Sequence, residues 1–141
     1  MGLFSELRQA RRDDADLGKG LWRRAHDRFR RGLDRFHQVL DGVNDDALYA
    51  QLLPVADELA ALLPRVRAIC VAAQELAPSE GLDIPPEQAA LHRALSRAGN
   101  DLATAAQAAT MARLGSGDVP SVRRRAEVVT ALIEDAERLL N

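Results

Sequence analysis

Lysine, cysteine and aromatic side chains are scarce in this sequence. The chain of 141 residues has 19 basic side chains, and Lys19 is the only lysine among them. A single cysteine excludes an internal disulfide. No apolar run is long enough to cross a membrane, and no segment resembles a signal peptide. The sequence therefore predicts a cytoplasmic protein without a transmembrane segment.

The short motifs of common catalytic and cofactor sites are also missing. The sequence has no glycine-rich phosphate loop, no Gly-x-Ser-x-Gly motif and no His-Glu-x-x-His motif. His26 and His37 are too far apart for one metal ion, since their separation in sequence corresponds to about 16 Å along a helix. Cys70 lies among apolar residues at helical spacing, which favours a core position over a nucleophile. We therefore predict a non-enzymatic protein with no catalytic, cofactor-binding or metal-binding residues.

Helix-forming residues dominate the chain. Apolar residues make up 47% of it, and they recur at spacings of three and four in four long segments. The expected helices cover residues 21–41, 46–77, 86–114 and 118–139. Because the links between them are short, neighbouring helices are expected to run antiparallel. The sequence thus predicts an all-α fold, an antiparallel up-down four-helix bundle.

Two prolines, Pro54 and Pro64, fall inside the second expected helix. Each lacks a backbone N–H and crowds the carbonyl four residues earlier, which belongs to Ala50 or Ala60. The helix should therefore bend at both places or restart at Pro54. The favoured interpretation is a curved helix around a core, and the alternative is a ligand pocket lined by the freed carbonyls.

The first 18 residues differ in pattern from the rest of the chain. Leu3, Phe4 and Leu7 are followed by several charged residues and then by Gly18 and Gly20. We expect this segment, residues 1–18, to form a short docked helix or a mobile arm. A single helical-bundle domain is expected to follow over residues 19–141.

Arginine clusters at two places. On the first long helix, the spacings of four, three and four place Arg24, Arg28, Arg31 and Arg35 in one row, opposite an apolar face that runs from Trp22 to Val43. The second cluster lies in the first turn of the last helix, where positive charge opposes the helix dipole. It consists of Arg123, Arg124 and Arg125. A GC-rich bacterial genome explains arginine in place of lysine, but it does not explain the clustering.

These seven arginines are the candidate partner-binding residues. The net charge is +3 over residues 1–44 and −5 over residues 45–118. We predict a helical protein-interaction module whose arginine face binds an acidic protein partner, or self-associates through the acidic middle of the chain. Nucleic-acid binding through the same arginines is an alternative, less favoured because the chain is acidic overall and aromatics are sparse. A small-ligand-binding bundle is another alternative.

Membrane contact through the first long helix is the least favoured interpretation. A Trp/Phe face opposite an arginine face is typical of helices that lie on a membrane surface. Each of the other expected helices, however, also has an apolar face that needs cover. Burial of the Trp22–Val43 face inside the bundle is therefore expected.

Overall fold

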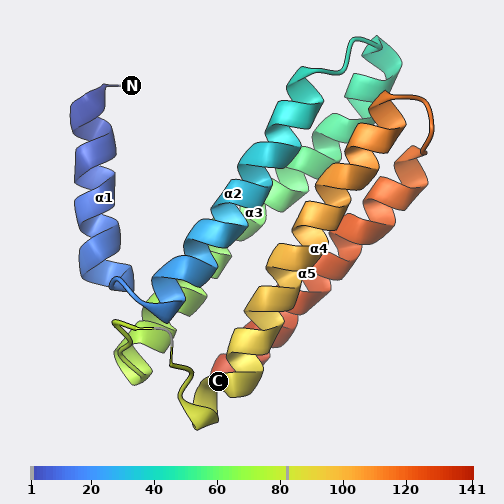
Figure 1. Cartoon of the computed structure of the whole chain (residues 1–141). Coiled ribbons are helices and arrows are strands. Elements are labelled where there is room, and N and C mark those ends of the chain that lie inside the picture. The colour runs from blue at the N-terminus through green and yellow to red at the C-terminus, as the bar shows by residue number, and fades with distance from the viewer. Residues whose placement is uncertain (1, 82) are drawn as a thin grey trace.

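The protein is built from helices throughout the part of the chain that the structure describes. The structure is a computed structural model that describes residues 2–81 and 83–141. The α-helices are α1 (Leu3–Leu17), α2 (Leu21–Asp41), α3 (Asp46–Leu76), α4 (Ala89–Arg113) and α5 (Val119–Leu140), and a 3₁₀ turn, η1 (Pro86–Gln88), precedes α4 (Figure 1). The predicted all-α class is confirmed. Among the described residues, none of the helices is long and apolar enough to span a membrane.

The helices α2 to α5 form a four-membered bundle whose packing order differs from the chain order. Helix α2 packs against α3 and α4, and α5 packs against the same two helices, whereas α3 and α4 contact each other only slightly. Figure 1 shows that α2 and α4 run in the same direction, opposite to α3 and α5. The hairpins α2–α3 and α4–α5 are thus antiparallel as expected, while α2 and α4 are parallel neighbours.

The bundle core consists of the predicted apolar faces. Trp22, Phe29 and Phe36 of α2 are almost completely buried, so the face that resembled a membrane-surface helix lies inside the bundle. Alanine and leucine of α4 supply the opposite wall, and small side chains such as Ala98 allow close helix approach. Leu76, the last residue of α3, is an exception because it is exposed where the chain leaves the helix.

Side-chain caps fix two of the helix starts. The carboxylate of Asp45 accepts a hydrogen bond from the backbone N–H of Leu48 at 2.9 Å, and that of Asp118 accepts one from Ser121 at 2.8 Å. Such a cap satisfies one of the first-turn N–H groups that have no partner within the helix.

The two prolines do not interrupt α3. The helix is continuous from Asp46 to Leu76, so the alternative in which it restarts at Pro54 is wrong. Pro54 and Pro64 are both exposed, which places the missing N–H groups on the solvent side of the helix rather than in the core. Neither proline lines either of the two clefts described below.

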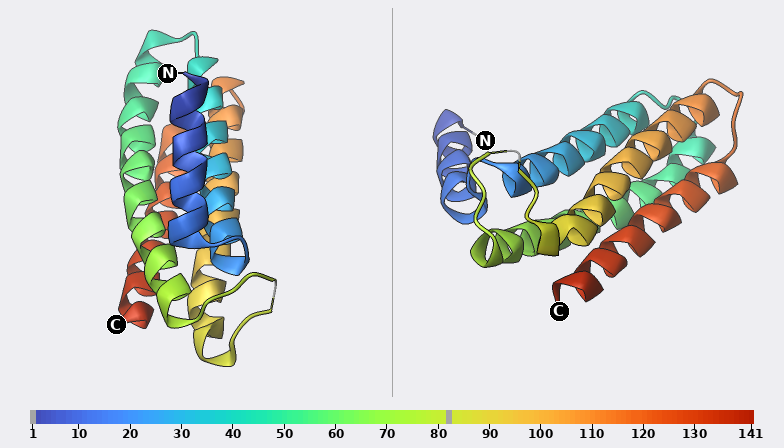
Figure 2. Two further views of the ribbon diagram at one scale, coloured as in Figure 1. Left: turned by 90° about the vertical axis from the view of Figure 1, so that its left-hand side faces the viewer. Right: turned by 60° about the horizontal axis from the view of Figure 1, so that its bottom comes forward.

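Helix α1 stands outside the four-membered bundle and packs on α2 and α3 (Figure 2). Within the described residues of the N-terminal segment, the chain thus forms a docked helix; Met1 lies outside them. Gly18, with φ +71°, ends α1, and the backbone of Gly20 lies so close to Ser79 that an added Cβ would be 2.4 Å from the Ser79 carbonyl oxygen. This close contact fixes the point where the chain passes from α1 to α2.

Candidate functional site

The six arginines of α2 divide into an inner pair and an outer row. The inner pair, Arg23 and Arg30, faces α1: Arg23 forms an ion pair with Asp14 at 2.7 Å, and Arg30 lies 4.0 Å from the carboxylate of Asp13. Arg23 also donates to Asp27 at 3.0 Å within α2. The inner pair therefore has a structural role in holding α1.

The outer arginine row, Arg24, Arg28, Arg31 and Arg35, faces solvent. All four side chains are exposed, and within residues 2–81 and 83–141 none forms an ion pair. Arg28 donates a hydrogen bond to the side-chain oxygen of Asn100 on α4, and its aliphatic part lies over Gly99. The row therefore contacts α4 through Arg28, and within the described residues none of its guanidinium groups has a carboxylate within 4.0 Å.

The second cluster lies at the start of α5. Arg123, Arg124 and Arg125 are exposed, and Arg124 donates to the hydroxyl of Ser121 at 2.9 Å. Hydrogen bonds from Ser121, together with the positive charge of Arg124, lower the pKa of the capping carboxyl of Asp118. This carboxylate offsets part of the unfavourable charge at the helix start.

The structure does not bring the two arginine clusters together. Helices α2 and α5 lie across the bundle from each other, because each packs against α3 and α4. The outer row and the cluster on α5 both point away from the core. They are two separate basic patches on helices that lie diagonally across the bundle.

An ion-pair cluster between α1, α2 and α3 was not predicted from the sequence. Asp13 is buried, accepts a hydrogen bond from Gln9 at 2.8 Å and lies 3.3 Å from Arg67 of α3. Arg67 also pairs with Asp16 at 2.9 Å. The three carboxylates of residues 13–16, next to two glycines, were the available signal, but nothing in the pattern of α3 marked Arg67 as their partner.

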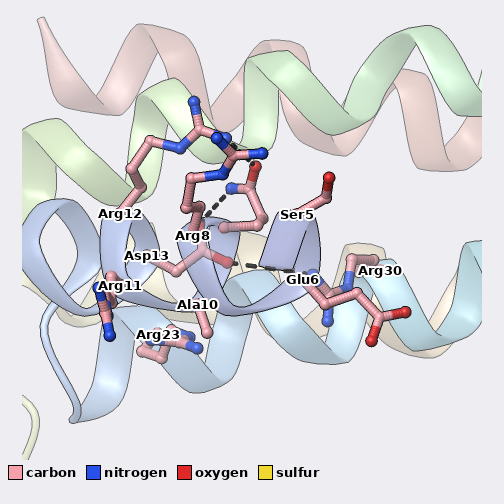
Figure 3. A pocket seen from close by; sticks show the side chains of 10 residues that line it. Ser5, Glu6, Arg8, Ala10, Arg11, Arg12, Asp13, Arg23 and Arg30 are labelled. Atoms are coloured by element: carbon pink, nitrogen blue, oxygen red, sulfur yellow. Dashed lines mark hydrogen bonds and ion pairs between the residues drawn. The ribbon is translucent and has the colours of Figure 1, made fainter. Parts of the chain in front are cut away.

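A cleft of about 810 Å³ lies between α1 and α2 (Figure 3). Five arginines line it, with Glu6 and Asp13 as the acidic residues; the five are Arg8, Arg11, Arg12, Arg23 and Arg30. Figure 3 shows that Arg8 and Arg12 leave α1 on one side, whereas Arg11 points toward Arg23 on the other. The cleft is open to solvent and mostly basic, so its chemistry suits anionic groups.

A smaller cleft, about 400 Å³, lies between α4 and α5. Its floor is apolar, with Ala94 and Leu132, and Arg93, Arg97 and Arg138 stand around it. Arg138 pairs with Asp135 of the same helix. The positive charge of one of the three arginines that line this cleft is therefore offset by a carboxylate.

The surroundings of the titratable residues inside the bundle favour a role in packing. Burial, with a smaller effect of Asp27, raises the pKa of the Cys70 thiol to about 12, as a core position implies. His26 is buried with its Nδ1 2.9 Å from the carboxylate of Asp27, and the ring of His92 lies edge-on to Trp22. Among the described residues, no group of three or more His, Cys, Asp or Glu side chains could hold a metal ion.

The chain matches no known protein-family model, no curated protein and no solved structure.

Proposed function

We propose that the protein is a non-enzymatic interaction module that binds an acidic protein partner through the outer arginine row on α2. The contrast between the two sets of arginines on this helix carries the proposal. Arg23 and Arg30 are each within 4.0 Å of a carboxylate of α1, whereas the four arginines of the outer row have no such partner in the described part of the chain. Four guanidinium groups about one turn apart along a rigid helix match carboxylates on a partner surface.

The α1 contact supports this choice of partner. Arg23, Arg30 and Arg67 show that the arginines of this bundle accept an aspartate-rich helix as a neighbour. A nucleic-acid role is less favoured, since the separation of the two basic patches leaves only a short row for phosphates and the chain is acidic overall.

The test uses two matched double substitutions and the purified full chain. Arg31→Gln/Arg35→Gln removes half of the outer row, and Arg93→Gln/Arg97→Gln removes two exposed arginines of α4. Proteins that co-purify from the source cells at low salt should be acidic. They should be lost with the first variant, retained with the second and released by high salt. An unchanged set of proteins on the first variant would overturn the proposal.

A second measurement separates the nucleic-acid alternative. Retention on heparin and on double-stranded DNA is measured as salt is raised. Strong retention with a steep salt dependence, lost in the Arg31→Gln/Arg35→Gln variant, would assign the row to phosphates instead of carboxylates.

A further inference from the structure

The N-terminal half of α1 displays large apolar side chains to solvent. Leu3 is 68% exposed, Phe4 78% and Leu7 46%. Positions i, i+1 and i+4 lie on one side of a helix, so the three side chains form one apolar patch. The buried residues of α1, Asp13 and Leu17, both lie in its C-terminal half. Helix α1 is therefore attached to the bundle through its C-terminal half and presents an apolar surface from its N-terminal half.

Three arginines follow this patch along α1, and they also line the cleft between α1 and α2. Arg8, Arg11 and Arg12 are exposed, and within residues 2–81 and 83–141 none of them forms an ion pair; Arg12 donates to the side-chain oxygen of Gln9 at 3.2 Å. Figure 3 shows that their guanidinium groups leave α1 on both sides.

The nearby carboxylates do not cancel this charge. Asp14 lies two turns beyond Leu7 on the same side of the helix, and it pairs with Arg23 of α2 at 2.7 Å. Asp13 is buried beside Arg67, and Asp16 is paired with the same arginine. Glu6 is the one remaining acidic side chain on α1, so the exposed side chains of this helix without an ion pair include three arginines and one glutamate.

We propose that α1 binds the surface of an anionic phospholipid membrane through this patch. Leu3, Phe4 and Leu7 enter the boundary between headgroups and acyl chains, and the three arginines contact lipid phosphates. The combination of exposed Leu and Phe with flanking arginines is what interfacial helices use. The apolar face of α2 is buried in the bundle, so α1 alone provides this contact, and the proposal does not depend on the outer arginine row.

Charge favours a lipid surface over a second copy of the chain. Pairing two such faces would gather six arginines around a small apolar contact, and like charges in close proximity oppose association. An anionic bilayer provides a continuous negative surface that accommodates all three arginines of one chain.

The experiment is flotation of the full chain with vesicles of phosphatidylcholine alone or mixed with phosphatidylglycerol. The protein should float with the mixed vesicles, stay behind with phosphatidylcholine vesicles, and be released as salt is raised. The Leu3→Ser/Phe4→Ser/Leu7→Ser variant should bind the mixed vesicles at least about tenfold more weakly, because it removes the inserted apolar area. Arg8→Gln/Arg11→Gln/Arg12→Gln should lose the preference for phosphatidylglycerol.

A matched control replaces three large apolar residues that are exposed elsewhere. Met111→Ser/Leu114→Ser/Leu139→Ser should float like the unmodified protein. Circular dichroism of each variant checks that the bundle is intact. Absence of flotation with any vesicle, or equal flotation of the α1 variants, would overturn the proposal. A concentration-dependent dimer that Phe4→Ser abolishes would assign the patch to a second copy and would also overturn it.

Discussion

Asp13 of α1 and Arg67 of α3 join two helices through a pair whose carboxylate is buried and 3.3 Å from the guanidinium. The other terminal nitrogen of Arg67, Nη1, is buried too and has no hydrogen-bond partner in the described part of the chain. Since Leu17 is the one fully buried apolar side chain of α1, polar contacts carry much of the attachment of this helix.

Asp13→Ala should therefore release α1 from the bundle. Arg67 keeps its ion pair with Asp16 in this variant, so we expect a cost of about 1–3 kcal/mol, that of removing one hydrogen-bonded partner from a mostly buried group. We expect faster hydrogen exchange over residues 3–17 with little change in α2 to α5, measured by mass spectrometry. Substitution of the exposed Asp57 by alanine is the control. Unchanged protection of α1 in the Asp13→Ala protein would show that apolar contact alone holds the helix.

Two glycines in helices should respond differently to alanine. A Cβ added at Gly99 would lie 3.5 Å from the side chain of Arg28, an ordinary contact, whereas one at Gly32 would lie 3.0 Å from Cδ2 of the buried Leu102. Alanine in a helix is favoured over glycine by about 1 kcal/mol, so Gly99→Ala should raise the melting temperature by several degrees. Gly32→Ala should show little gain or a loss, since the crowded α2–α4 contact opposes it. Equal melting temperatures for the two variants would contradict this packing.

Asp27 should contribute to the acid sensitivity of the fold. Burial alone would raise the pKa of the Asp27 carboxyl. Hydrogen bonds with His26 and Arg23 outweigh burial and lower this pKa from its usual 3.8. A lowered pKa in the folded state gives stability that is complete above the usual pKa and is lost as pH falls through the lower, folded-state value. Denaturant unfolding between about pH 5 and pH 2 should therefore show a weaker acid dependence for Asp27→Asn than for the unmodified protein. Asp57→Asn is the control, and identical pH dependence for Asp27→Asn would refute this role.

The thiol of Cys70 should be inert in the folded protein. With its pKa raised to about 12 by burial, it is almost entirely protonated near neutral pH. A disulfide reagent at pH 8 should react only as fast as the protein opens, and completely once guanidinium chloride unfolds it. Rapid stoichiometric reaction of the native protein would instead mean that this part of α3 is accessible.

Local patterns in the sequence predicted most of the helices. The periodic apolar residues gave the ranges of α2, α3 and α5 to within one residue at each end, whereas α4 begins at Ala89, three residues later than expected, after a 3₁₀ turn. These signals act within a few residues, so they can be read without knowing the neighbours. The exposed outer arginine row follows from the same periodicity.

Contacts between helices could not be read in this way. Helical spacing shows that Arg67 is on a polar side of its helix, but only the position of α1 brings Asp13 to it. The same holds for Leu3, Phe4 and Leu7. Apolar residues at this spacing usually pack against a neighbouring helix, but in α1 they are exposed. The packing of α4 beside α2 was not predicted either, because the sequence between α3 and α4 carries no apolar period.

The order in which the helices pack also has a consequence for folding kinetics. The α2–α3 and α4–α5 hairpins are each closed by a short loop, residues 42–45 and 114–118, so their contacts are local in sequence. Contacts of this kind form early and make helical proteins fast folders. The α2–α4 interface links residues far apart in the chain and requires both hairpins. We therefore expect its formation, at the close approach of Gly32 and Leu102, to limit the folding rate.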